Sequence, residues 1–140
     1  EDMPFEIGKA LVLNEGSDVS LIATGHLVWE ALEAAKQLEA EGISAEVIDI
    51  HTIKPLDNEA ILRSVAKTGC VVGCEEHQYN GGLNESIAQL LVRNNPAPME
   101  FVGVDDKFGE SGTPDELMAK YGLKATNIVA AAKKAIARKK

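Results

Sequence analysis

Short apolar runs rich in β-branched residues alternate along this chain with longer stretches in which apolar residues recur every three or four positions. The short runs are typical of strands, and the longer stretches are typical of amphipathic helices. Strand and helix in alternation predict parallel strands joined by crossover helices. We therefore expect an α/β fold, a three-layer α/β/α sandwich with a mostly parallel sheet of about five strands and one antiparallel edge strand.

Turn-forming residues set the expected element boundaries. The spacer at 14–18 is short enough for a hairpin, so we expect the run at 10–13 to pair with the run at 19–23 as an antiparallel edge strand. Asp57 and Gly69 are expected to cap the start and the end of one helix. Further strands are predicted at 45–50, 70–73 and 99–104, and helices at about 28–38, 58–68, 83–91, 114–121 and 126–136.

Charge separates the body of the chain from its C-terminus. The 140 residues carry a net charge of −8, and five of the fourteen Lys and Arg lie at 133–140. Residues 1–132 therefore carry 9 − 22 = −13. Nucleic-acid backbones are bound by clustered Lys and Arg, so this charge argues against a nucleic-acid partner. The basic tail is interpreted as the solvated end of a helix, where cations complement the helix dipole.

Length, hydropathy and cysteine content limit the class of protein. We expect one domain over 1–140, with 1–9 as an entry linker from a preceding domain. No apolar run approaches the roughly 20 residues of a membrane-spanning helix, so a soluble, cytoplasmic protein is expected. Cys70 and Cys74 share one predicted strand, which would place their Cα atoms about 13 Å apart, too far for a disulfide. They are interpreted as buried thiols in a reducing compartment.

Two predicted strand-to-helix turns carry features of an anion site. Thr24-Gly25 ends a strand and opens a helix, and Gly81-Gly82 stands directly before another helix. Backbone N–H groups at a helix start favour anions. Neither turn belongs to a complete dinucleotide or Walker motif, and the carboxylate of Glu75 opposes a phosphate at the second. A plain turn is the preferred interpretation at both places.

Histidine offers two further chemistries. Glu76 beside His77 would form an acid–base pair only if a turn brought their side chains together, because neighbours on an extended segment point to opposite faces. His26, His51 and His77 lack the spacing of a zinc ligand set. Structural or interface roles are preferred for these histidines. No serine lies in a nucleophile-elbow motif.

Three segments in order resemble the C-terminal domain of transketolase, the thiamine-diphosphate enzyme that transfers two-carbon ketol units between sugar phosphates. They are 46–57 (EVIDIHTIKPLD), 71–86 (VVGCEEHQYNGGLNES) and 108–118 (FGESGTPDELM). The opening at 5–25 is similar to the entry into that domain from the pyrimidine-binding domain, so the resemblance covers nearly the whole chain. The same domain closes 1-deoxyxylulose-5-phosphate synthase and the β subunit of 2-oxo-acid dehydrogenases, where arginine usually stands at the position of His51. This histidine favours transketolase.

The resemblance implies that the catalytic parts lie outside this chain. In transketolases, thiamine diphosphate and its Mg²⁺ or Ca²⁺ are held by the preceding domains, across the interface of a homodimer, and no catalytic, cofactor-binding or metal-binding position can be carried over to this sequence. The partners implied are those preceding domains or a separate subunit that contains them. The candidate domain-docking or anion-turn positions are Thr24, Gly25, His51, Lys54, Glu76, His77, Gly81 and Gly82. Shaping tight turns is their competing interpretation.

Two alternative functions stay open. The first keeps the enzyme class and makes the chain the end of a 2-oxo-acid dehydrogenase β subunit or of deoxyxylulose-phosphate synthase. The second is a non-enzymatic module that binds a small anion through the Thr24-Gly25 or Gly81-Gly82 turn, which the acidic surroundings disfavour.

Overall fold

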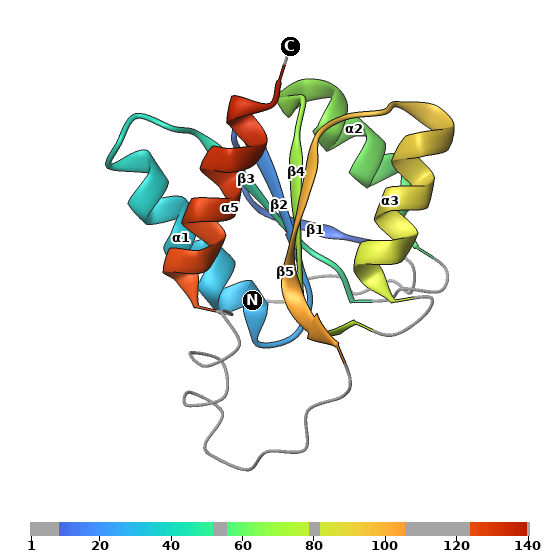
Figure 1. Ribbon diagram of the computed structural model, residues 1–140, viewed down its shortest axis with the longest axis horizontal. Coiled ribbons are helices and arrows are strands. Elements are labelled where there is room, and N and C mark those ends of the chain that lie inside the picture. Colours follow the sequence, from blue (N-terminus) through green and yellow to red (C-terminus); the bar gives the residue numbers. More distant parts are fainter. Residues whose placement is uncertain (1–8, 52–55, 79–81, 106–123, 140) are drawn as a thin grey trace.

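The computed structural model describes residues 9–51, 56–78, 82–105 and 124–139. Its sheet has the strand order β1-β3-β2-β4-β5, in which β2 to β5 are parallel and β1 is antiparallel to β3 at one edge. The predicted α/β/α sandwich is confirmed (Figure 1). The elements are β1 (Leu11–Asn14), β2 (Val19–Ala23), α1 (Leu27–Glu39), β3 (Ala45–Asp49), α2 (Asn58–Thr68), β4 (Val71–Gln78), α3 (Leu83–Asn94), β5 (Met99–Asp105) and α5 (Ala125–Ala137).

Two apolar cores lie on opposite faces of the sheet, because side chains along a strand alternate between its faces. Leu21 of β2 belongs to the core under α1 and α5, while the next residue, Ile22, belongs to the core under α2 and α3. Figure 1 shows these two helix pairs on either side of the strands. All five residues of β2 are buried, as expected for a strand covered on both faces and paired on both edges.

The predicted hairpin between the first two strands is wrong, although β1 is the expected antiparallel edge strand. β1 pairs with β3, since both edges of β2 are taken by β3 and β4. The connection crosses the start of β3 and is fixed there by hydrogen bonds. Asp18 Oδ2 accepts the N–H of Ser44 at 2.7 Å, and a Cβ on Gly16 would lie 2.3 Å from the carbonyl carbon of Ala45.

The caps predicted for α2 are confirmed. The Asp57 side chain accepts the N–H of Ala60 at 3.2 Å, and Gly69 ends the helix with a φ of 84°. The strand β4 continues to Gln78, well beyond the predicted end at 73. The predicted helix at 114–121 lies outside the described residues.

A buried carboxylate joins α2 to the sheet. Glu46 of β3 is 3% exposed, and its Oε1 accepts bonds from the Lys67 ammonium and from the N–H of Gly16. Burial alone would raise the pKa of the Glu46 carboxyl, but the bonds from Lys67 and Gly16 outweigh burial and leave that pKa below its usual value. This ion pair fixes α2 against the amino end of β3.

The basic C-terminus is not simply solvated, which corrects the interpretation from sequence. Lys139 Nζ donates to the carbonyl oxygens of Asp18 at 3.0 Å and Thr68 at 2.9 Å. Arg138 pairs with Glu100, while Lys133 pairs with Glu41 at 2.6 Å. The cation of Lys139 thus reaches the C-terminal carbonyls of α2, so the tail stabilises a neighbouring helix end.

Both cysteines are buried and unpaired, as predicted. Burial raises the pKa of the Cys74 thiol to about 12, and it also raises the pKa of the Cys70 thiol. Both thiols are therefore protonated and inert at neutral pH. Among the described helices, none is long and apolar enough to cross a membrane.

Candidate functional site

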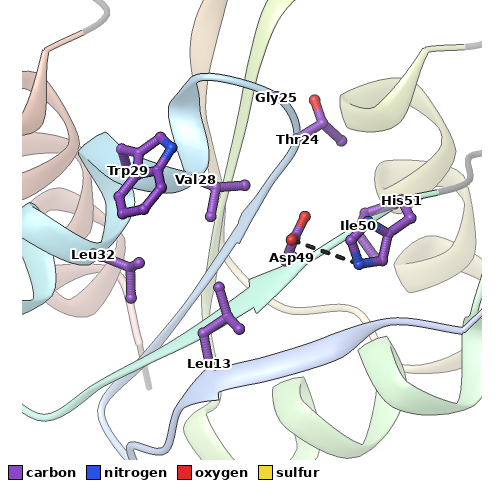
Figure 2. Close-up of a pocket in the computed structure, with 9 residues that line it drawn as sticks. All are labelled: Leu13, Thr24, Gly25, Val28, Trp29, Leu32, Asp49, Ile50 and His51. Carbon is purple, nitrogen blue, oxygen red and sulfur yellow. Dashed lines mark ion pairs between the residues drawn. The ribbon is translucent and has the colours of Figure 1, made fainter. Parts of the chain in front are cut away.

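A cavity of about 570 Å³ opens where β2 and β3 end and α1 begins. The carboxyl edge of a parallel sheet is the usual place for ligands or partners in α/β proteins. Figure 2 shows α1 on one side of this cavity and β1 and β3 on the other. The residues that line it are Leu13, Thr24, Gly25, Val28, Trp29, Leu32, Asp49, Ile50 and His51.

The ends of the two strands are held in place by backbone hydrogen bonds. Ile50 donates its N–H to the carbonyl of Ala23 at 2.9 Å, and Thr24 donates to the carbonyl of Cys74 at 3.2 Å. The peptide group that joins Ala23 to Thr24 is thereby held between β4 and the end of β3. Gly25 follows with a φ of 59°, a left-handed conformation that turns the chain into α1.

The first N–H groups of α1 are already hydrogen-bonded to carbonyls of the preceding turn. Leu27 donates to the carbonyl of Thr24, Val28 to that of Gly25, and Trp29 to that of His26, at 3.1 to 3.2 Å. An anion at a helix start needs these donors free. The geometry of the Thr24-Gly25 turn is therefore that of a tight turn, which weakens the anion interpretation.

An ion pair lies on the β3 side of the cavity. His51 Nε2 lies 3.6 Å from Asp49 Oδ2, with 27% of the His51 side chain and 19% of the Asp49 side chain exposed (Figure 2). The pair places a carboxylate and an imidazole beside an apolar wall. A surface of this kind suits a polar or basic group of a ligand or partner better than a phosphate.

The apolar wall ends in an exposed indole. Val28 and Leu32 of α1 are buried or half-buried, whereas Trp29 is 74% exposed. Large aromatic side chains at a cavity rim are enriched in contact surfaces, because they bury much area with few rotatable bonds. Trp29 was not among the residues selected from sequence, where a lone Trp in a helical stripe gave no signal of exposure.

At the second predicted turn, a buried carboxylate already binds the N–H groups that begin α3. Glu75 is 5% exposed, and its carboxylate accepts the N–H of Leu83 at 3.2 Å and of Asn84 at 2.8 Å. A carboxylate thus occupies the position that a phosphate would take at the start of α3. Glu75 was interpreted from sequence only as a repulsive charge, and no local pattern predicted that it binds the N–H groups of a helix eight residues further on. Gly82 is the N-cap residue of α3.

The structure brings three of the predicted site residues together, Thr24, Gly25 and His51, at one cavity. Gly82 lies instead at the start of α3, after β4. Glu76 and His77 have their backbone in β4, and their side chains are outside the described part of the chain. Lys54 and Gly81 lie outside the described residues altogether. In the ranges that the structure describes, no three His, Cys, Asp or Glu residues are placed to hold a metal ion.

Fold and site together define an α/β domain of three layers with a mostly apolar cavity at the carboxyl edge of its sheet. The family model of the transketolase C-terminal domain matches residues 8–128. The chain therefore belongs to the transketolase C-terminal domain family.

Known relatives agree with this assignment. The chain is 50% identical over 139 residues to the 6-deoxy-6-sulfo-D-fructose transketolase subunit of Clostridium sp. strain MSTE9, covering 99% of this chain and 43% of that protein. It is 38% identical over 135 residues to 1-deoxy-D-xylulose-5-phosphate synthase 1 of Geobacter sulfurreducens, covering 95% of this chain and 21% of that protein. A solved structure described as a split gene transketolase, inactive β4 tetramer, matches with a TM-score of 0.93 and 48% identity, covering 99% of this chain and 45% of that one. The chain thus spans less than half the length of these relatives.

Proposed function

We propose that this chain is the C-terminal, non-catalytic domain of a transketolase, which transfers a two-carbon ketol unit between sugar phosphates with thiamine diphosphate. The proposal places the coenzyme and its Mg²⁺ or Ca²⁺ on the other domains of a cytoplasmic homodimer, of which this domain supports the assembly. The observation that carries it is the 50% identity over almost the entire chain to a transketolase subunit more than twice as long.

The described residues do not fit the coenzyme. A diphosphate needs free N–H donors or cations, but the donors that begin α1 bind the carbonyls of residues 24–26, and those that begin α3 bind Glu75. The carboxylate of Asp49 lines the same cavity as Thr24, Gly25 and His51. These observations support placing the coenzyme outside this chain, and no reaction step is assigned to its residues.

Docking to the other domains is the role proposed for the carboxyl edge. The 570 Å³ cavity combines apolar walls with the Asp49–His51 pair, a composition found at protein contact surfaces. Thr24, Gly25 and His51 belong to this edge, and the proposal extends to the other positions selected from sequence, Lys54, Glu76, His77, Gly81 and Gly82.

The reaction is tested on the full-length protein that carries this domain, assembled with any partner subunit. We expect ketol transfer from xylulose 5-phosphate to ribose 5-phosphate that depends on thiamine diphosphate and Mg²⁺. Activity with pyruvate and glyceraldehyde 3-phosphate instead would assign the chain to a deoxyxylulose-phosphate synthase, an alternative favoured by the 38% identity to such an enzyme. Oxidative decarboxylation of a 2-oxo acid would assign it to a dehydrogenase β subunit.

The non-catalytic role is tested on the 140-residue chain alone. Calorimetric titration with thiamine diphosphate and Mg²⁺, followed by xylulose 5-phosphate, is expected to give no heat of binding. Binding with micromolar affinity, about −8 kcal/mol, would contradict the accessory role. Inorganic phosphate in the same experiment tests the small-anion alternative. The N–H donors at the starts of α1 and α3 argue against that alternative, because they are bonded within the chain.

A further inference from the structure

Three cavities lie end to end along the flank of α1 that faces β1. The 570 Å³ cavity at the carboxyl edge shares Trp29 and Leu32 with a second cavity of about 400 Å³. That cavity shares Asn14 and Glu39 with a third, of about 300 Å³, near the turn from α1 to β3. Together they form one channel, the α1–β1 groove, defined by Leu13, Asn14, Trp29, Leu32, Ala35 and Glu39.

The groove exists because the helix layer stops before the sheet does. On this face, α1 packs on β2, β3 and β4, and α5 packs on β2, β4 and β5. The edge strand β1 projects beyond α1 and leaves Leu11 and Leu13 half-buried. An apolar strip beside a helix at the edge of a layered domain is the shape that a further helix would fill.

The strongest sign of a contact surface is Trp29. Its side chain is 74% exposed in the middle of the groove, where two of the three cavities meet. Tryptophan is one of the residues enriched among those that carry most of the energy of protein–protein contacts. Leu32 lies beside Trp29 in two of the cavities, and Ala35 continues the apolar lining into the third.

The rim of the groove is acidic. Glu15, Glu33 and Glu39 line its cavities, as does Asp49 at the carboxyl edge, while among the described residues Lys36 is the one Lys or Arg that lines them. Four carboxylates against one ammonium favour a basic partner, since complementary charge steers and orients association.

A helix suits the groove better than an added strand. β1 has four residues, and its pairing with β3 shifts register between Val12 and Asn14. Short, irregular edge strands disfavour strand addition. The 13 residues of α1 give the groove a length of about 20 Å, which matches three to four turns of a partner helix.

We propose that the α1–β1 groove docks a basic, amphipathic helix from the part of the enzyme outside this domain, with Trp29 as its apolar anchor. The inference rests on the proposed function for the identity of that partner. Relatives extend far beyond the matched region, because this chain covers 43% and 45% of two of them, so a large additional body is available to cover the groove. The basic residues at the C-terminal end of α5 and just beyond it are poorer candidates from a second copy, since Lys133, Arg138 and Lys139 already bind within the chain.

Hydroxyl-radical footprinting of the full-length, assembled enzyme tests whether Trp29 is covered. We expect oxidation of Trp29 to be slower than in the urea-unfolded enzyme by at least about fivefold, because anchor residues are fully desolvated. Oxidation close to the unfolded rate would match the 74% exposure and would overturn the proposal.

Carbodiimide cross-linking identifies the occupant, because this reagent joins carboxylates only to amines in direct contact. We expect Glu33 and Glu39 to be linked to lysines outside residues 1–140. Lys36 stands three residues from both Glu33 and Glu39 on α1, so links to Lys36 are expected within the chain. Links confined to lysines within 1–140 would come from the same chain or, where they form only as protein concentration rises, from a second copy, and would overturn the proposal.

Matched variants of the full-length enzyme test the contribution of the groove. Trp29→Lys is expected to accelerate hydrogen exchange of the peptide 27–39 in the assembled enzyme by roughly 30-fold, the effect of losing a hot-spot side chain. Val92→Lys is the control, since Val92 is also 74% exposed but lies on α3, across the sheet. Glu33→Lys should act like Trp29→Lys more weakly, whereas Glu59→Lys on α2 should have no effect. Equal behaviour of Trp29→Lys and Val92→Lys would refute the docking surface.

These outcomes are separable from those of the proposed function. If the enzyme transfers ketol units and Trp29 is still oxidised rapidly, the proposed function is supported and the docking surface is refuted. A protein in which Trp29 is covered but ketol transfer is absent keeps the docking surface and loses the reaction.

Discussion

Glu75→Gln tests whether the carboxyl edge is organised by an internal cap. In the wild-type chain, the two oxygens of Glu75 accept the N–H groups of Leu83 at 3.2 Å and Asn84 at 2.8 Å, and the residue is 5% exposed. The glutamine side chain has the same shape but one acceptor oxygen, so its NH₂ group would face one of the two N–H donors.

The expected cost follows from these contacts. A hydrogen bond to a charged group contributes about 1.5 to 3 kcal/mol, and a carboxylate at a helix start contributes up to about 1 kcal/mol more through the helix dipole. We therefore expect Glu75→Gln to lower the free energy of unfolding of the 140-residue chain by about 2 to 4 kcal/mol. The helix itself should persist, since Leu83, Ile87 and Leu91 remain packed in the core under α2 and α3.

Urea unfolding at pH 7, followed by circular dichroism at 222 nm, measures this difference. Glu33→Gln is the control, because Glu33 is an exposed residue of α1 and surface substitutions change stability by no more than about 0.5 kcal/mol. Hydrogen exchange should localise the effect of Glu75→Gln to the first turn of α3. A stability within about 0.5 kcal/mol of the wild type would refute the cap as a determinant of this edge.

Three further predictions concern the buried interior. Gly73→Ala should destabilise the chain by about 1 to 3 kcal/mol, because the new Cβ would lie 2.1 Å from Oδ1 of Asn84. Adding Asn84→Ala should relieve much of that cost, so the double variant should be more stable than the sum of the two single effects predicts. Free-energy changes that simply add would contradict this clash. Glu46 has a lowered pKa in the folded chain, so its contribution to stability is present above its unfolded pKa and is lost as pH falls through the folded pKa. Glu46→Gln should therefore reduce the loss of stability that the chain shows as the pH is lowered. An unchanged dependence of stability on acidic pH would contradict the role of the Lys67 pair. Cys74, whose pKa is about 12, should resist iodoacetamide at pH 8 until urea unfolds the chain, and rapid labelling of the folded chain would show that it is accessible.

The edge strand illustrates the limit of local reasoning. The short spacer at 14–18 led to the correct prediction that β1 is an antiparallel edge strand, and its half-buried and exposed residues agree with that position. The pairing partner depended on β2, which is buried throughout and requires neighbours on both edges. A short spacer therefore favoured a hairpin locally, and the sheet order decided against it.

The candidate site was predictable in position and unpredictable in detail. The sequence predicted that polar turns gather at the carboxyl edge, and Thr24, Gly25 and His51 do line one cavity there. It contained no signal that Glu75 accepts two N–H groups across an eight-residue separation, or that Lys139 reaches the carbonyl of Thr68 from the far end of the chain. Such bonds depend on which segments the sheet places side by side.

The sequence by itself determined the α/β class, the caps of α2, the inert thiols and the family, because each follows from local periodicity, local hydrogen bonding or a stretch of matching residues. Only the tertiary structure decided that Trp29 stands exposed in a groove between α1 and β1. Helical spacing places Trp29 at the margin of the apolar face of α1. Whether a residue at that margin is covered depends on how far the neighbouring layer extends, and on this side of the sheet the helices end one strand short of the edge.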